Sequence, residues 1–245
     1  MAAVASVWQQ LLATYHPDKR RWDRIYPWIG YVLRPVSFVV TVPLRRLGVT
    51  ADQVTALTAV LGALACALLS LGTRPGFVWG GLAVTALNLF DCVDGNLARL
   101  RPRPGPPRGK FYDQLVGYFF PLSYFCLGLG LARAHPGDAL ALAAAGAATT
   151  LARVLVSTVR LEFGSVLAPA WQHARESGRV PRAVHAYRWY ARGYHNLTEL
   201  SGHDFLLWIA ALGGWLPYFL VVSAMIALLD LAFTVTFHVT RAARL

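Results

Sequence analysis

Long apolar runs constrain the fold of this chain more than any other feature. Of its 245 residues, 56% are hydrophobic and only 14% are charged. A run of about 20 apolar residues is the length that an α-helix needs to cross the hydrocarbon core of a bilayer. The hydropathy pattern predicts six membrane spans, at residues 53–72, 77–99, 109–133, 137–164, 203–215 (extended at its start) and 217–240.

These runs predict an all-α, polytopic membrane protein in two parts. Residues 1–50 are expected to form a cytoplasmic and membrane-surface segment, and residues 51–245 a six-helix transmembrane domain. Within 20–36, apolar residues recur at helical spacing beside arginines, which is typical of an interfacial amphipathic helix that binds lipid headgroups. A similar pattern predicts a second surface helix over 182–195.

The charge balance predicts the orientation. The formal net charge is +11, and basic residues concentrate in 100–110 and 171–195. Because cytoplasmic loops carry an excess of Lys and Arg, both segments and both termini are expected to face the cytoplasm. A high basic charge also occurs in nucleic-acid-binding proteins, but the long uncharged runs do not fit that class. We therefore expect a multi-pass protein of a prokaryotic inner membrane with no nucleic-acid partner.

Three aspartates stand inside or beside apolar runs, where a carboxylate is costly and usually marks a functional site. Asp91 and Asp94 are three residues apart and share one helical face. Asp113 lies near the start of the next run, between Gly109 and Gly117 in steps of four. The two faces are expected to converge at the cytoplasmic end of neighbouring spans. Carboxylates in such a cluster are the ligands that a hard divalent cation prefers.

Two other interpretations of these acids are consistent with the sequence. They would be structurally inert if they formed salt bridges with Arg99, Arg153 or Arg160. Alternatively, they would relay protons in a transporter.

The spacing of the cluster resembles a known signature. The chain reads Asp91-x-x-Asp94-Gly95-x-x-Ala98-Arg99, then nine residues, then Gly109-x-x-x-Asp113. This string resembles the signature of the CDP-alcohol phosphotransferase family, D-x-x-D-G-x-x-A-R, a variable loop, then G-x-x-x-D-x-x-x-D. Before the first span, GVTADQVTAL is similar to the family's TPNxVT segment, with Thr50 and Thr55 retained.

The resemblance implies a membrane enzyme, commonly a homodimer, that transfers a substituted phosphoryl group from a CDP-alcohol to an acceptor and releases CMP. It implies that Asp91, Asp94 and Asp113 bind Mg²⁺ or Mn²⁺. The residues that it implies in substrate binding are Thr55, Gly95, Ala98, Arg99 and Gly109. A pocket at the depth of lipid headgroups favours CDP-diacylglycerol as the donor, with membrane lipids around it.

Position 117 departs from the family pattern, because Gly117 stands where the signature has its last aspartate, the residue assigned as the base. Three interpretations follow. The acceptor is already ionised, as a phosphate or carboxylate is, and needs no base. Another group replaces the base, such as Asp52, Glu162 or a histidine of the 185–203 region. Or the protein is a weak or inactive relative that binds CDP-lipid.

Arg153 and Arg160 favour the first interpretation. Seven residues apart on the predicted fourth span, they share a face and suit an anionic acceptor. An equally consistent interpretation is that they snorkel or pair with Glu162. The sequence thus predicts a transferase of the CDP-alcohol phosphotransferase type. The alternative is a transporter, or a protein that binds CDP-lipid and metal without turnover.

Overall fold

The computed structural model describes residues 2–101, 107–167, 169–170, 194, 198–199 and 204–243. All regular secondary structure in these ranges is helical. The longer helices are α1 (Ala2–Thr14), α3 (Arg34–Arg46), α4 (Ala51–Ser70), α5 (Arg74–Arg99), α6 (Pro107–Gly117), α7 (Phe119–Ala134), α8 (Ala139–Glu162), α11 (Phe205–Gly213) and α12 (Leu216–Ala242). The shorter elements are α2 (Pro17–Asp23), η1 (Ile29–Leu33), η2 (Pro136–Asp138) and η3 (Phe163–Leu167).

Within the described ranges, five helical segments are long and apolar enough to cross a membrane. They are Ala51–Ser70, Arg74–Arg99, Phe111–Ala134, Pro136–Leu167 and Leu216–Ala242. The predicted all-helical class is confirmed, and these segments begin and end within a few residues of five predicted spans. The remaining predicted span, 203–215, corresponds to α11, which has nine residues. That length is too short to cross a bilayer by itself.

Local sequence explains where α4 and α5 begin. The Thr50 hydroxyl accepts a hydrogen bond from the Gln53 N–H, and the Gln53 side chain accepts one from the Thr50 N–H, which makes a capping box. The Thr73 hydroxyl accepts from the Gly76 N–H at the start of α5. Between the two helices, Gly72 has φ +73°, a left-handed conformation that ends α4 without steric strain.

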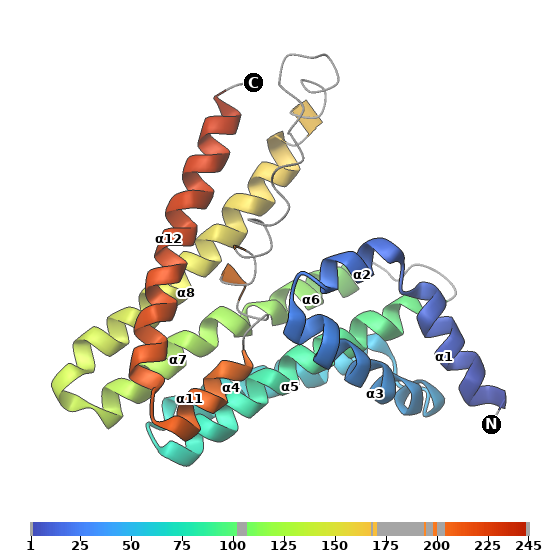
Figure 1. Cartoon of the computed structure of the whole chain (residues 1–245), viewed down its shortest axis with the longest axis horizontal. Coiled ribbons are helices and arrows are strands. Elements are labelled where there is room, and N and C mark those ends of the chain that lie inside the picture. The colour runs from blue at the N-terminus through green and yellow to red at the C-terminus, as the bar shows by residue number, and fades with distance from the viewer. Residues whose placement is uncertain are drawn as a thin grey trace.

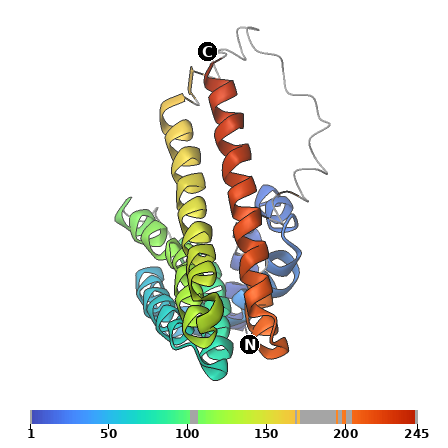
Figure 2. The same ribbon diagram turned by 90° about the vertical axis from the view of Figure 1, so that its left-hand side faces the viewer.

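The spans meet in one main core. Figure 1 shows α4, α5 and α7 in the lower part of the molecule, with α8 and α12 rising from one end. Figure 2 shows α8 and α12 running beside each other. Fully buried leucines lie where the helices meet, among them Leu69 of α4, Leu127 of α7, Leu207 of α11 and Leu220 of α12. This core holds the spans together and leaves the N-terminal elements at the opposite end.

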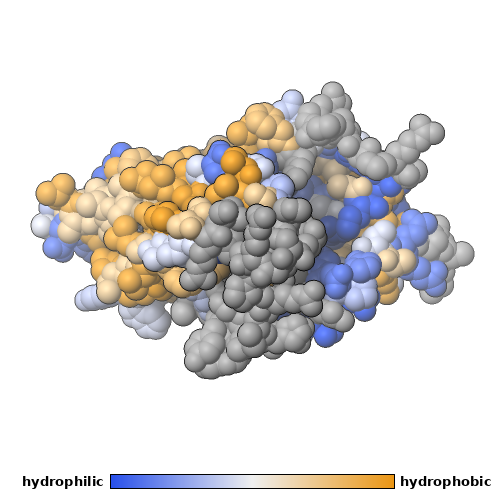
Figure 3. Space-filling view, turned by 90° about the horizontal axis from the view of Figure 1, so that it is seen from above, coloured by the Kyte–Doolittle hydropathy of each residue, from blue (hydrophilic) through white to orange (hydrophobic). Residues whose placement is uncertain are grey.

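The surface is apolar at one end of the molecule and polar at the other. In Figure 3, hydrophobic residues gather over the left part of the face that is seen. Hydrophilic residues gather over the right part, toward the end where α1, α2 and α3 lie in Figure 1. An apolar surface of this extent on the membrane-spanning helices is the one that lipid covers.

The prediction of one continuous helix over 20–36 is wrong. Helix α2 ends at Asp23, and η1 and α3 follow after a break. Pro27 explains the break, because it has no N–H to donate and disfavours the helical conformation of Tyr26. Asp23, Tyr26 and Arg34 are buried, so part of this segment faces the protein. The helix predicted over 182–195 lies outside the described residues, apart from Tyr194.

Glycines mark the closest helix crossings. A Cβ at Gly128 of α7 would lie 2.9 Å from the Cα of Gly146 in α8. A Cβ at Gly130 would collide with the carbonyl oxygen of Leu69 in α4. Small residues permit this close backbone approach, as is common between membrane helices.

The Gly130 crossing gives a test of the packing. Gly130→Ala should destabilise the protein by about 2–3 kcal/mol, because the added methyl group forces α4 and α7 apart. Gly137→Ala is the matched control, since its Cβ would have nothing within 4 Å. Thermal unfolding of both variants in detergent measures the difference. Wild-type stability of Gly130→Ala would contradict the described approach of α4 and α7.

Candidate metal centre

Three carboxylates meet between the C-terminal part of α5 and the middle of α6. Asp91 and Asp94 come from α5, and Asp113 comes from α6. One oxygen from each of the three lies within 4.8 Å of the others. Asp94 is buried, Asp91 is half-buried and Asp113 is exposed, so the cluster opens to the surface on the α6 side. The convergence predicted from the spacing is confirmed.

None of the described lysines or arginines forms a salt bridge with this cluster. Arg99 donates to Asn96, and Arg153 and Arg160 pair with Asp230. The alternative of inert salt bridges between the acids and these arginines is therefore wrong. Three carboxylates this close repel one another, and their oxygens form the kind of donor set that suits a hard divalent cation.

Thr55 of α4 contacts the cluster. Its hydroxyl oxygen lies 2.9 Å from Oδ2 of Asp94 and 3.0 Å from the carbonyl oxygen of Ala51. Both are acceptors and the hydroxyl has a single proton, so Thr55 donates to one of them at a time; when it donates to Asp94, it holds that carboxylate in place. The family resemblance implied substrate binding by Thr55, and the structure places it beside a carboxylate.

The glycines of the motif differ from those at helix crossings. A Cβ at Gly95 would meet only the Arg99 guanidinium, at 3.5 Å, and a Cβ at Gly109 only the Asp52 carboxylate, at 3.8 Å. A Cβ at Gly117 would have nothing within 4 Å. No described neighbour therefore requires glycine at these positions by packing. The space beside them is open to a ligand.

Asn96, which the sequence analysis missed, fixes the end of α5. It is 1% exposed, and its Nδ2 donates to Ser37 Oγ at 3.0 Å and to Thr41 Oγ1 at 3.1 Å, both in α3. Its Oδ1 accepts from Arg99 Nη2 at 2.7 Å. Arg99 thus supports α5 through Asn96 and not through the acids, while Ala98 is exposed. Asn96 occupies an unspecified position of the motif, so the motif gave no signal for it.

A buried acid ties the N-terminal elements to α5. Asp23 is 2% exposed and accepts from Tyr15 Oη at 2.9 Å and from Arg34 Nε at 2.8 Å, while Lys19 Nζ lies 2.9 Å from its other oxygen. Burial by itself raises the pKa of Asp23, but the Lys19 hydrogen bond and the Arg34 charge outweigh it and lower the pKa below its usual value. Arg34 Nη1 also reaches Asn96 Oδ1, at 3.4 Å.

A cavity of about 590 Å³ adjoins the acid cluster. Asp91 and Gly117 line it, so it includes the position of the missing acid. Basic side chains with acidic partners line it in two further groups: Lys19, Asp23 and Arg34, and Arg153, Arg160 and Asp230. The cavity therefore offers cationic groups contributed by the N-terminal elements and by α8.

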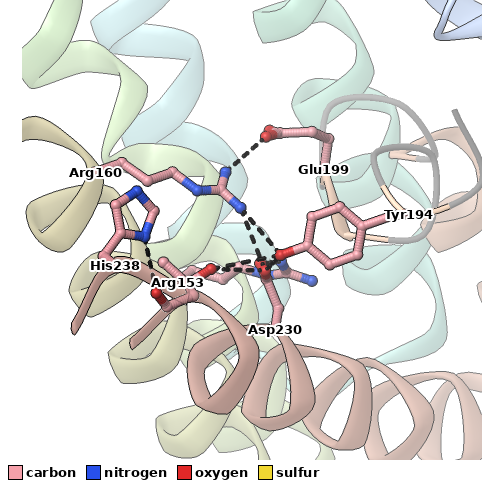
Figure 4. A network of polar contacts seen from close by, with 7 residues as sticks. Arg153, Arg160, Tyr194, Glu199, Asp230 and His238 are labelled. Carbon is pink, nitrogen blue, oxygen red and sulfur yellow. Dashed lines mark hydrogen bonds and ion pairs between the residues drawn. The ribbon is translucent and has the colours of Figure 1, made fainter. Parts of the chain in front are cut away.

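Asp230 of α12 holds both arginines of α8 (Figure 4). Arg153 Nη1 donates to one of its oxygens at 2.8 Å, and Arg160 Nη2 to the other at 3.2 Å. The Tyr194 hydroxyl donates to the same carboxylate, and Arg160 Nη1 donates to Glu199 at 3.3 Å. Arg153 is 7% exposed and lines the cavity, and its Nε has no hydrogen-bond partner among the described residues.

The alternative pairing of these arginines with Glu162 is wrong, because they pair with Asp230 and Glu199 while Glu162 is exposed. Asp230 is a lone acid within the apolar run of the last span, so a signal for it was present in the sequence. Of the groups considered as a replacement base, Asp52 pairs with Arg101 at 2.8 Å. The histidines of the 185–203 region lie outside the described residues.

A comparison of the chain with models of known protein families gave no match, and a comparison with curated proteins gave none either.

The Asp23 network predicts a pH-dependent contribution to stability. Asp23→Asn should destabilise the protein by about 3 kcal/mol at neutral pH, because it leaves the buried Arg34 without its anion. The folded-state pKa of Asp23 is lowered, so this contribution is full above the unfolded-state pKa of about 4 and is lost as pH falls through the folded-state value.

Chemical unfolding across this pH range measures the contribution. Asp18→Asn, an exposed acid of the same helix, is the control and should leave stability nearly unchanged. If the loss in free energy of unfolding caused by Asp23→Asn stays constant from neutral pH down to below the folded-state pKa of Asp23, the assignment is contradicted.

Proposed function

We propose that this chain is an integral membrane transferase of the CDP-alcohol phosphotransferase type. It moves a substituted phosphoryl group, preferably phosphatidyl from CDP-diacylglycerol, to an acceptor and releases CMP. The observation that carries the proposal is the carboxylate cluster, which has the spacing of that family's signature, lacks a described basic partner and adjoins a cavity.

Asp91, Asp94 and Asp113 are the residues that would hold Mg²⁺ or Mn²⁺. Such an ion, when bound, neutralises charge on the diphosphate of the donor. The chain itself supplies positioning: Thr55 holds Asp94, and Asn96 holds the end of α5 against α3. The open space beside Gly95 and Gly109 leaves room for the nucleotide.

The acceptor is proposed to be anionic. Arg153 and Arg160 are kept in place by Asp230, and Arg153 Nε is a donor without a described partner. A phosphate or carboxylate group in the cavity would add a charge-assisted hydrogen bond to the guanidinium groups, of which Arg160 is the more accessible. Such an acceptor is already ionised at neutral pH, which agrees with the absence of an acid at Gly117.

The finer membrane arrangement belongs to the same proposal. Together with the residues that precede it, α11 forms the sixth span, and Gly214 after it allows a tight turn into α12. The basic segments, both termini and the acid cluster face the cytoplasm. The N-terminal elements lie at the headgroup surface, and the protein is a homodimer of a prokaryotic inner membrane.

The second candidate is a CDP-lipid- and metal-binding protein, or a transporter, without turnover. Gly117 is the observation that favours it, because the signature's last acid is absent. Release of CMP separates the two candidates.

Metal-dependent CMP release from the purified protein, with CDP-diacylglycerol and a panel of acceptors, tests the proposal. Asp91→Asn, Asp94→Asn and Asp113→Asn should each lower the rate by roughly a hundredfold or more, since each removes a charge that the cation needs. Asp138→Asn, an exposed acid at the start of α8, is the control and should retain the wild-type rate. Full activity of any cluster variant would remove that residue from the ligand set.

Position 117 gives a separate prediction about the acceptor. The unmodified protein should use a phosphate- or carboxylate-bearing acceptor better than a neutral alcohol, and its rate should level off above the acceptor's second phosphate pKa of about 6. Arg160→Gln should raise the KM of that acceptor. Gly117→Asp has room for its side chain. The variant should raise the rate of turnover with a neutral alcohol acceptor. It should lower the rate with the anionic acceptor, because the added carboxylate repels it.

Competition between an anionic and a neutral acceptor, assayed with the unmodified protein and with Gly117→Asp, measures which acceptor each protein prefers. Efficient use of a neutral alcohol such as inositol by the unmodified protein would refute the pre-ionised acceptor. Turnover itself would remain established in that case.

A further inference from the structure

Helices α4 and α7 pack against each other and come very close at two points. A Cβ at Gly62 would collide with the ring of Phe119, and a Cβ at Gly130 would collide with the carbonyl oxygen of Leu69. Both residue numbers increase from the first contact to the second, so the two helices run in the same direction. Residues on the facing sides between these points are therefore held against each other.

Two cysteines occupy this stretch of the interface, Cys66 in α4 and Cys126 in α7. Cys66 lies between Gly62 and Leu69, four residues after the first and three before the second. Cys126 precedes Gly130 by four residues. Residues three or four apart share a helical face, so both cysteines lie on the sides where the helices meet.

The two thiols contact each other. Each side chain is within hydrogen-bond reach of the other, and the Ser70 hydroxyl, which donates to the Cys66 carbonyl oxygen at 2.8 Å, also reaches the Cys126 sulfur. Both thiols are free and both residues are half-buried, whereas Cys92 is buried in α5. Backbones that approach this closely bring the Cα atoms toward the separation of about 4.4–6.8 Å that a disulfide needs.

We propose that Cys66 and Cys126 are a redox site and form a reversible disulfide that joins α4 to α7. The reaction is an exchange with a small apolar disulfide that enters the membrane. One cysteine attacks this oxidant and forms a mixed disulfide, and half of the oxidant leaves as a thiol. The other cysteine then attacks its neighbour's sulfur, and the second half leaves. Each cysteine proton passes to one released thiol, so two cysteines are oxidised and one oxidant molecule is reduced to two thiols.

The disulfide lies away from the acid cluster but closes the segment that carries it. Cys66 is eleven residues beyond Thr55, which is about 16 Å along α4 at 1.5 Å per residue. The chain between the two cysteines contains α5 and α6, and with them Asp91, Asp94 and Asp113. In the orientation proposed above, the pair lies toward the non-cytoplasmic side, where disulfides persist. The redox site does not depend on the proposed transferase activity.

The test is oxidation of the purified full chain in detergent with dithiodipyridine, followed by digestion and mass spectrometry without reductant. A linked pair of peptides joined by Cys66 and Cys126 should appear, two hydrogens lighter than the two thiol peptides together, and dithiothreitol should reverse it. The Tm should rise by about 5 to 15 °C, because the cross-link closes a loop of about 60 residues in the unfolded chain. A thiopyridyl label retained on both cysteines, a link between two molecules, or no reaction would overturn the proposal.

Two variants locate the effect. Cys66→Ser and Cys126→Ser each remove one partner, so each should abolish the linked peptides and the rise in Tm, and the remaining thiol should keep the thiopyridyl label. Cys92→Ser is the matched control and should keep both effects, because Cys92 belongs to α5. If a variant does not fold, the linked peptides of the unmodified protein decide. A rise in Tm that persists in Cys126→Ser would refute the assigned pair.

Discussion

A carboxylate enclosed among apolar helices needs a partner that neutralises it. Asp23 is balanced by Lys19 and Arg34, and Asp230 by Arg153 and Arg160. The first pairing joins neighbouring elements of the N-terminal segment, and the second joins α8 to α12 across 77 positions of the sequence. The carboxylates of α5 and α6 have no such partner in the described part of the chain. The same rule that explains the two ion-pair networks therefore leaves this cluster in need of a cation.

The two networks also determine what the cavity presents. Arg34 is fixed by Asp23 and reaches Asn96, so the N-terminal elements are held beside the helix that carries the acids. Arg153 is fixed by Asp230 and lines the cavity, and its buried Nε has no described partner. Ammonium and guanidinium groups, each paired with an acid, thus line a space next to the clustered carboxylates. They are groups that could donate hydrogen bonds to an anionic substrate beside a divalent ion.

Local rules predicted the parts of this structure that depend on neighbouring residues. The length of the apolar runs predicted six spans, five of which correspond to described helices long enough to cross a membrane. Helical spacing predicted the meeting of Asp91 with Asp113. Pro27 is a local signal against a helix over 20–36, and it competes with the amphipathic pattern of the same residues. The pairing of Arg153 with Asp230 joins residues 77 positions apart, and Asn96 reaches α3 across more than 50. Such contacts depend on how whole helices pack, which the spacing within one helix does not determine.

The central claim is that the acid cluster binds a divalent metal, and binding of Mn²⁺ measured by electron paramagnetic resonance tests it most directly. The purified protein should take up Mn²⁺ saturably and lose most of its affinity in Asp113→Asn. Asp113 is the informative position because it is exposed, so its replacement leaves the buried packing intact. Binding that is equally tight in Asp113→Asn, or no saturable binding to the unmodified protein, would contradict the account.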